Sequence, residues 1–183
     1  MRAFETEKTE VAEIDRSVYD IKDKVNAAFE VNSGLTAEIV EQISKEKHDP
    51  DWMREFRLKA LDIYNKASIP NWGPSLEGLD MRNIVTYVRP NTEMRGKWSE
   101  VPDDIKNTFE RLGIPQAERS SLAGVGAQYA SEVVYHNVKE EVAAQGVVYT
   151  DMESALTGPY ADMVKEHFMK CVPPTDHKFA ALH

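Results

Sequence analysis

Apolar residues recur at intervals of three and four along several stretches of the chain, and this spacing places them on one face of a helix. The first such stretch is Val18, Ile21, Val25 and Phe29. A shorter stretch follows Thr36, a favourable N-cap residue, and contains Ile39, Val40 and Ile43. Leu35 and Val40 are spaced to form a hydrophobic staple around that cap. The pattern therefore predicts two helices before His48.

A longer helix is predicted to start at Asp49-Pro50. Asp49 is expected to act as the cap, and Pro50 occupies the first helical position, where its missing N–H costs nothing. One apolar stripe follows, formed by Trp52, Met53, Phe56, Ala60, Leu61 and Tyr64. The helix should end near Lys66, because Ile69-Pro70 disfavours helical backbone. A stripe of this kind usually packs into a core, but a docking surface for a partner stays open as an alternative.

The rest of the chain alternates turn signals with short segments. Residues 68–80 are rich in Pro and Gly and predict a loop, and Gly124-Val125-Gly126 predicts a turn. Strands are predicted where β-branched and aromatic residues follow one another, at Ile84–Val88, Val133–Tyr135 and Val147–Tyr149. Further helices are predicted over Pro102–Gly113, Pro115–Leu122 and Val138–Gly146, and one should start at a capping box at Thr150–Glu153. A last helix is predicted from Pro159 until Val172-Pro173-Pro174 ends it. The fold class expected is α+β, predominantly helical, with a few short strands.

Composition narrows the class of protein. The 183 residues fit about one domain. A net charge of −9 argues against broad nucleic-acid or anionic-membrane binding, which needs a positive face. No apolar run approaches the roughly 20 residues of a membrane span, and Met1–Glu10 lacks the apolar stretch of a signal peptide. We therefore expect a soluble, acidic, cytoplasmic protein, and the single cysteine, Cys171, fits a reducing compartment.

Few residues suggest chemistry. Near the C-terminus, the metal-ligand types Cys171, Asp176, His177 and His183 occur close together, but their spacing fits no standard site. Cys171 with a histidine could form a nucleophilic pair, although a lone cysteine after an apolar helix is more often a packing residue. Gly124-Val125-Gly126 lacks the third glycine of a dinucleotide-binding loop. The sequence therefore assigns no catalytic, cofactor-binding or metal-binding residue.

Several stretches nevertheless resemble, in order, the SufB family of iron–sulfur cluster assembly scaffolds. They are Asp49–Ala60, Asn71–Pro74, Val101–Lys106, Thr108–Pro115, Leu122–Tyr129, Ser131–His136, Asp151–Met152 and Lys178–His183. The resemblance runs from about residue 34 to the end and is weaker over residues 1–33. It implies the N-terminal, mostly helical region of the family, truncated before a large right-handed parallel β-helix core.

We expect three parts. The first is a weakly ordered segment over residues 1–33, where the charged start of the chain is weakly patterned; the resemblance implies the other two, a mostly helical N-terminal domain over residues 34–175 and the start of the missing core over residues 176–183. Lys178–His183 should then be poorly ordered or packed in a non-native way, because its apolar residues normally contact that core. The cysteine and acidic residues implicated in the family's chemistry lie beyond His183, so no site residue is carried over.

For function, the resemblance implies a structural and interaction region of a scaffold in the SUF system, whose partners are the SufC ATPase and the SufD paralogue. We expect no enzyme activity and no cofactor in this part of the protein, because one cysteine cannot supply the roughly four ligands of a cluster. Two alternatives stay open. One is an autonomous protein-binding module that uses the Trp52–Tyr64 helix face, and the other is a small enzyme that uses Cys171 and a histidine.

Overall fold

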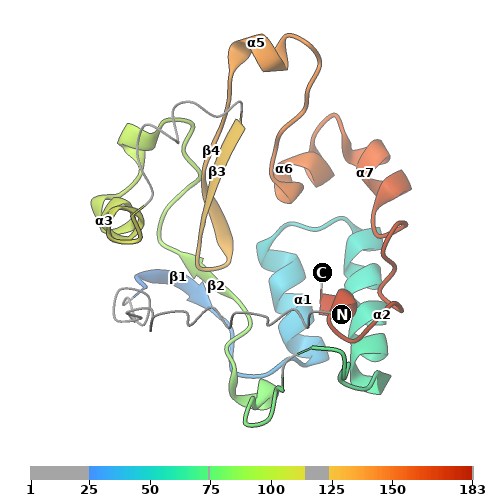
Figure 1. Cartoon of the computed structure of the whole chain (residues 1–183). Coiled ribbons are helices and arrows are strands. Elements are labelled where there is room, and N and C mark those ends of the chain that lie inside the picture. Colours follow the sequence, from blue (N-terminus) through green and yellow to red (C-terminus); the bar gives the residue numbers. More distant parts are fainter. Residues whose placement is uncertain (1–24, 74, 114–123, 183) are drawn as a thin grey trace, which may run out of the picture.

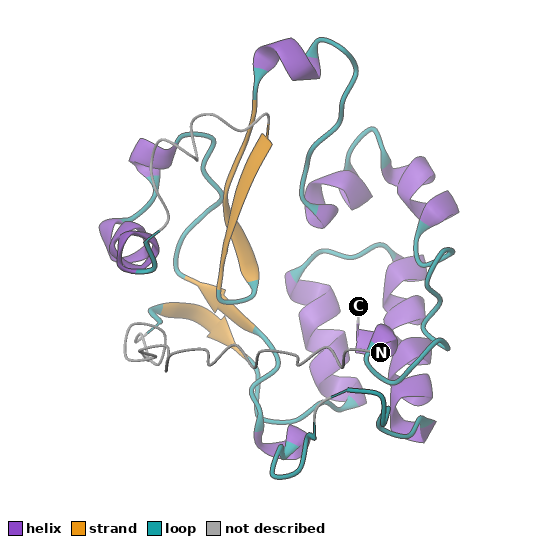
Figure 2. Ribbon diagram, viewed as in Figure 1, coloured by secondary structure: helices purple, strands orange, loops and turns teal. Residues whose placement is uncertain are grey.

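The structure is a computed structural model that describes residues 25–73, 75–113 and 124–182. Of these residues, 41% are helical and 16% lie in strands or bridges, which confirms a mixed α+β chain with more helix than strand (Figure 2). The strands are β1 (Ala27–Glu30), β2 (Val88–Pro90), β3 (Gly124–Tyr129) and β4 (Glu132–Val138). The α-helices are α1 (Ala37–Glu46), α2 (Asp51–Lys66), α3 (Asp103–Arg111), α5 (Glu140–Ala143), α6 (Met152–Thr157) and α7 (Ala161–His167).

Helices α1 and α2 pack side by side, and the hairpin β3–β4 stands apart from them with α3 on its outer side (Figure 1). The predicted start of α1 after Thr36 is confirmed, and so is the predicted end of α2 at Lys66. Thr36 Oγ1 accepts a hydrogen bond from Ile39 N at 3.3 Å, which is the expected N-cap. Val40, Leu61 and Tyr64 form a buried cluster between the two helices, and Leu35 packs against it.

Asp49 does not cap α2, so that part of the prediction is wrong. The N-cap is Pro50, which makes no side-chain capping bond. The fully buried Asp49 carboxylate instead accepts hydrogen bonds from Ser44 Oγ at 2.9 Å and from Arg57 Nε at 2.6 Å. Asp49 therefore ties the end of α1 to the first turns of α2, because its side chain points between the helices.

Residues 1–24 lie outside the described part of the chain, so the helix predicted over Val18–Phe29 can be compared with the structure only from residue 25 onward. There the prediction is wrong. Residues 27–30 form β1, which pairs antiparallel with β2. Phe29 packs on Tyr87, with 6.1 Å between ring centroids, beside a buried cluster of Val31, Ile39 and Tyr87. Pairing with a distant strand therefore overrides the helical spacing of the local sequence. The domain start expected at residue 34 lies after β1, which is paired with β2.

The strand predicted at Ile84–Val88 is displaced toward the C-terminus. Regular pairing covers Val88–Pro90, while Val85 makes only an isolated bridge to Ser33. The described residues of the predicted 68–80 loop contain no regular helix or strand.

The turn predicted at Gly124-Val125-Gly126 is wrong, because both glycines lie in β3, paired with β4. Their lack of a side chain makes room for a ring: a Cβ at Gly124 would lie 3.2 Å from Tyr149 Cδ1, and one at Gly126 would lie 3.0 Å from Tyr149 Oη. The strand predicted at Val147–Tyr149 is also wrong. These residues are exposed, and Tyr149 instead stacks on His136 of β4, with 4.8 Å between centroids.

The hairpin and α3 share a core of their own. Val101, Ile105, Ala127, Val134 and Tyr135 are buried together. The rings of Phe109 and Tyr135 each meet Trp98 edge-on, with 5.4 Å between centroids. This arrangement confirms the helix predicted after Pro102 and the strand at Val133–Tyr135, whereas the helix predicted over residues 115–122 falls outside the described residues.

The last two helices are present where they are predicted, but their limits differ: α7 starts at Ala161 rather than Pro159 and ends at His167, before Val172. The N-cap of α6 is Asp151 rather than Thr150, and the Asp151 carboxylate accepts hydrogen bonds from Ser154 N at 2.8 Å and Ser154 Oγ at 2.6 Å. Among the described residues, no helix is both long and apolar enough to cross a bilayer.

The expectation that Lys178–His183 is poorly ordered is wrong for Lys178–Leu182. A 3₁₀ turn over Ala180–Leu182 packs on α2, and Ala180 and Ala181 are 4% and 5% exposed. Lys178 Nζ donates to the carbonyl oxygens of Tyr64 at 2.6 Å and Ala67 at 3.0 Å. Ala181 is buried in the cluster with Val40, Leu61 and Tyr64, whereas Leu182 is 41% exposed.

Candidate functional site

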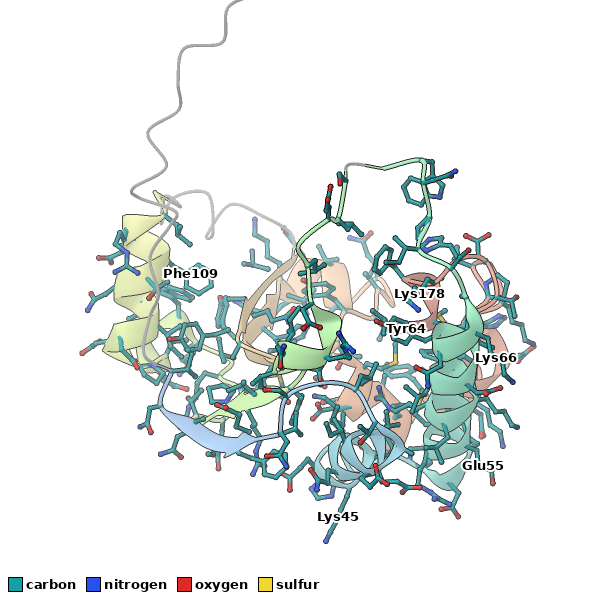
Figure 3. All side chains as sticks on the ribbon, turned by 90° about the horizontal axis from the view of Figure 1, so that it is seen from below. Lys45, Glu55, Tyr64, Lys66, Phe109 and Lys178 are labelled. Carbon is teal, nitrogen blue, oxygen red and sulfur yellow. The ribbon has the colours of Figure 1, made fainter. Side chains whose placement is uncertain are left out.

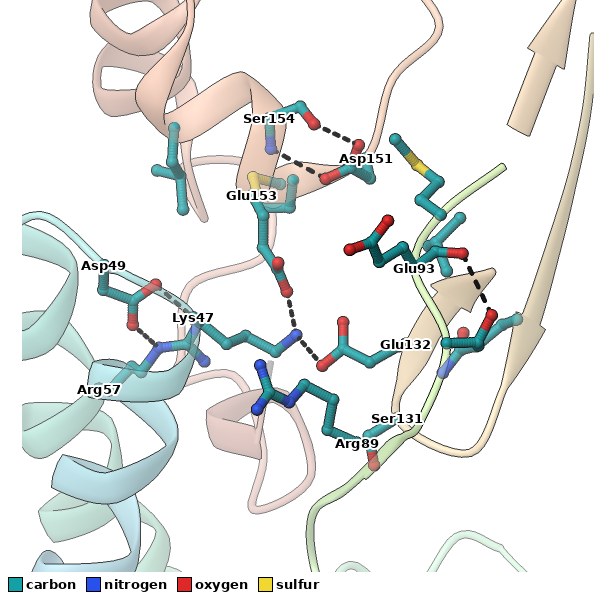
Figure 4. A pocket seen from close by; sticks show the side chains of 16 residues that line it. Lys47, Asp49, Arg57, Arg89, Glu93, Ser131, Glu132, Asp151, Glu153 and Ser154 are labelled. Atoms are coloured by element: carbon teal, nitrogen blue, oxygen red, sulfur yellow. Dashed lines mark hydrogen bonds and ion pairs between the residues drawn. The ribbon is translucent and has the colours of Figure 1, made fainter. Parts of the chain in front are cut away.

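A polar cavity of about 460 Å³ lies where the two-helix layer, the hairpin tip and α6 meet (Figure 4). It is lined by residues from the α1–α2 connection, α2, the segment after β2, the β3–β4 turn and α6. Its charged lining residues are Lys47, Asp49, Arg57, Arg89, Glu93, Glu132, Asp151 and Glu153. Charged side chains from several separate elements come together here, so this junction is the candidate site.

Lys47, the C-cap residue of α1, stands at the centre of the junction. Its Nζ lies 2.7 Å from Glu132 Oε1 and also donates to the carboxylate of Glu153. The Tyr87 hydroxyl donates to the same Glu132 oxygen, and Lys47 Nζ lies 5.2 Å from the Tyr87 ring centroid. The side chains of Lys47 and Glu132 are each only 16% exposed. One ammonium thus serves two carboxylates from β4 and α6.

Burial, hydrogen bonds and neighbouring charges shift the pKa values of three groups at the junction. Burial, helped by the charge of Glu132, raises the pKa of Glu153 although Lys47 acts in the opposite direction. Burial, followed by the hydrogen bond and the charge of Glu132, raises the pKa of Tyr87, so its phenol stays protonated and donates. Burial also disfavours the charged form of Asp151, but hydrogen bonds from Ser154 outweigh it and lower the pKa.

The other two cations of the lining are held by carboxylates of their own. Arg57 makes a forked contact with Asp49, in which Nε and Nη2 reach the two carboxylate oxygens at 2.6 and 3.4 Å. Arg89 Nη2 lies 3.1 Å from Glu46 Oε2. Because each of these cations is already paired with a carboxylate of the same chain, the arrangement can join separate elements of the fold.

The residues singled out near the C-terminus do not form one group in the structure. Cys171 is exposed. His177 Nδ1 accepts from Ala180 N at 3.2 Å, and its Nε2 lies 3.8 Å from Asp176. His183 lies outside the described residues. Within the described ranges, no set of three or more His, Cys, Asp and Glu side chains is arranged to hold a metal ion.

The apolar stripe of α2 is covered by the chain itself. Met53, Ala60, Leu61 and Tyr64 are buried. The half-buried rings of Trp52 and Phe56 meet Phe168 edge-on, with centroids 6.0 and 5.1 Å away. The stripe is thus internal packing and leaves little of this face open to a partner.

The sequence did not point to the residues of the junction. Lys47, Tyr87, Glu132 and Glu153 are widely separated along the chain, and charged residues at such positions are ordinarily solvated. Glu132 lies inside one of the stretches that resemble the SufB family, but that resemblance carries no role for it. No local spacing signals the contact, because it depends on how the three elements are folded together.

Comparison with known proteins identifies the class. The chain is 50% identical over 165 residues to the iron–sulfur cluster assembly protein SufB of Bacillus subtilis, a match that covers 90% of this chain and 35% of that protein. A SufBD family protein of Staphylococcus haemolyticus is 46% identical over the same shares. A SufBD family protein of Mycobacterium tuberculosis is 42% identical over 97% of this chain and 21% of its own length. No protein-family model and no solved structure matches the chain.

These relatives are iron–sulfur cluster assembly proteins, and the similarity extends over nearly the whole of this chain. The chain therefore belongs to the SufB/SufBD family. It spans about a third or less of the length of the curated relatives it matches.

Proposed function

We propose that this chain is the N-terminal structural and interaction region of a SufB-like scaffold that takes part in iron–sulfur cluster assembly in the cytoplasm. The observation that carries the proposal is its identity to SufB of Bacillus subtilis across nearly all of its length. In the proposed scaffold the cluster is cargo, and the SufC ATPase and the SufD paralogue are the partners of the whole protein. This region itself performs no catalysis and holds no cofactor.

The packing of the described residues supports a structural role. One buried core lies around α1 and α2, and another lies under the hairpin. They are joined by ion pairs whose partners both belong to this chain, such as Lys47 with Glu132. The internal packing of the α2 stripe speaks against an autonomous module that docks through Trp52–Tyr64, because Phe168 already covers that face. The exposed position of Cys171, with no histidine contact among the interactions of the described residues, speaks against a Cys/His enzyme.

A chimera tests the proposal. The matching part of Bacillus subtilis SufB is replaced by residues of this chain in a strain that depends on that gene, and growth and iron–sulfur enzyme activity in extracts are measured. We expect the chimera to support both. A chimera that also carries Met53→Asp should fail, because Met53 is 1% exposed and a buried unpaired carboxylate disrupts the core.

The same chimera with Cys171→Ser separates the alternatives. A scaffold region should tolerate this change, since Cys171 is exposed. Loss of assembly in this variant, at unchanged protein level, would favour the Cys171 enzyme instead. A chimera that accumulates normally but supports no assembly would overturn the proposal.

A further inference from the structure

The described part of the chain is built from bodies that do not share a core. The cluster under the hairpin consists of Val101, Ile105, Ala127, Val134 and Tyr135. Within the described ranges, no residue of this cluster belongs to the clusters around α1 and α2. Buried apolar packing is what makes a body rigid, so two bodies with separate cores can move as units. We call α3, β3, β4 and α5 the arm, and α1, α2 and the turn Ala180–Leu182 the body (Figure 1).

The β3–β4 turn at the base of the arm meets β2 through Ser131 and Val88. Beyond β2 the chain already pairs with the arm, because Arg95 N donates to Val134 O at 3.0 Å and His136 N donates to Arg95 O at 3.1 Å. Ser131, in the β3–β4 turn, donates its N–H to Val88 O at 3.0 Å, and Val88 N donates to Ser131 Oγ at 3.0 Å. Two hydrogen bonds at a single turn hold a position but leave a rotation about it largely open. They act as a pivot rather than as a rigid interface.

Lys47 supplies the restraint that the pivot lacks. From the end of α1 it reaches Glu132, the first residue of β4, and Glu153 of α6, where the chain returns from the arm to the body (Figure 4). It therefore ties down both the start and the return of the segment that contains β4 and α5. Tyr87, which is buried in a cluster with Ile39 of α1, also donates its hydroxyl to Glu132.

The cavity of about 460 Å³ beside these side chains shows that the joint is not filled by apolar packing. Folded interiors are normally close-packed, so open volume at a junction leaves space for the arm to turn. We propose that Lys47 is a clamp that sets the angle of the arm against the body, and that breaking its ion pairs lets the arm turn about the Val88–Ser131 contact.

Paired spin labels on the full chain test the clamp. The exposed Cys171 is changed to Ser, and labels are attached at Glu140→Cys on α5 and Asp62→Cys on α2, both exposed positions on the two bodies. Distance distributions are measured for this parent, for Lys47→Met, and for Lys47→Arg, which retains the charge. Arg54→Met is the matched control, because it removes an ion pair to Glu41 that joins α1 and α2 within the body.

We expect Lys47→Met to shift and broaden the distance distribution, while Lys47→Arg and Arg54→Met keep that of the parent. Far-ultraviolet circular dichroism should be unchanged in all of them, which separates a loosened joint from unfolding. If Lys47→Met loses helix content, Glu132→Gln replaces it, since the amide keeps an acceptor for Tyr87 and loses the charge. A distribution identical to the parent in a folded Lys47→Met or Glu132→Gln chain would overturn the proposal.

Discussion

Lys178 closes the C-terminal end of α2 through Tyr64: its Nζ donates to the Tyr64 carbonyl oxygen at 2.6 Å and lies 4.0 Å from the centroid of the Tyr64 ring (Figure 3). It also donates to Ala67 O at 3.0 Å. The last carbonyls of a helix have no partner within it, and a cation there is favoured by the helix dipole. The Lys178 side chain thus supplies hydrogen bonds to carbonyl oxygens at the end of α2 and holds Ala180 and Ala181 against this helix.

Replacing Lys178 should therefore cost stability. Lys178→Met keeps most of the aliphatic contact with the ring but removes both hydrogen bonds, and we expect the free energy of unfolding to fall by about 1–3 kcal/mol. Urea denaturation followed by circular dichroism measures it. Lys66→Met is the control, because its pair with Asp62 is exposed and should be worth about 0.5 kcal/mol or less. Equal losses in the two variants would show that the cap contributes nothing.

The contact between Phe56 and Phe168 predicts a measurable coupling. Phe56 is half-buried, so Phe56→Ala should cost less than the roughly 3–5 kcal/mol of a fully buried ring. In a double-mutant cycle with Phe168→Ala, the coupling free energy should be about 0.5–1.5 kcal/mol, as expected of rings that meet edge-on. The same cycle with the exposed Leu79→Ala should be additive. Additivity with Phe168 as well would mean that the α2 face is open in solution.

The raised pKa of Glu153 predicts how the stability of the folded chain changes with pH. Its pKa is raised in the folded chain, so the folded state binds the proton more tightly than the unfolded state. Its contribution to stability is fully present below the unfolded value of 4.5 and is lost as the pH rises through the folded value. Glu153→Gln should remove this decline and leave the chain at pH 7 at least as stable as its parent, because the amide still accepts from Lys47.

Asp151→Asn is the control for the pH dependence of stability, because the pKa of Asp151 is shifted in the opposite direction to that of Glu153. The pKa of Asp151 is lowered, so its contribution is present above the unfolded value of 3.8 and is lost as the pH falls through the folded value. Urea unfolding between pH 3 and pH 7.5 should therefore show changes of opposite slope in the two variants. A Glu153→Gln chain that loses stability at pH 7 while matching its parent at low pH would contradict the assigned direction.

Iron–sulfur reconstitution should leave this chain without a cluster. A cluster takes about four protein ligands, usually thiolates, and the chain has one cysteine. After anaerobic incubation with iron and sulfide and removal of excess reagent, we expect no stable visible absorption band. Cys171→Ser should behave in the same way as the parent. A band that persists in the parent and disappears in Cys171→Ser would make this region a cluster site in its own right.

Local sequence was sufficient to predict the start of α1 and, to within a residue, the limits of α2. The Thr36 cap and the spacing from Met53 to Tyr64 act within a few residues, and the structure follows them, although Pro50 is the N-cap of α2 and not its first helical residue. The same holds for α3 after Pro102 and for the strand around Val134. The stretches that match SufB could be recognised for the same reason, since they are contiguous runs whose identity is independent of the fold.

Tertiary structure decided the features that depend on a distant partner. Residues 27–30 have helical spacing with their neighbours but form β1, because β2 offers its backbone hydrogen bonds. Gly124 and Gly126 extend as a strand because β4 pairs with them, and their lack of a side chain leaves room for the Tyr149 ring. Lys47, Glu132 and Glu153 acquire a joint role only when α1, β4 and α6 meet, since ion pairing acts over a few ångströms of space and leaves no trace in the spacing of residues along the chain.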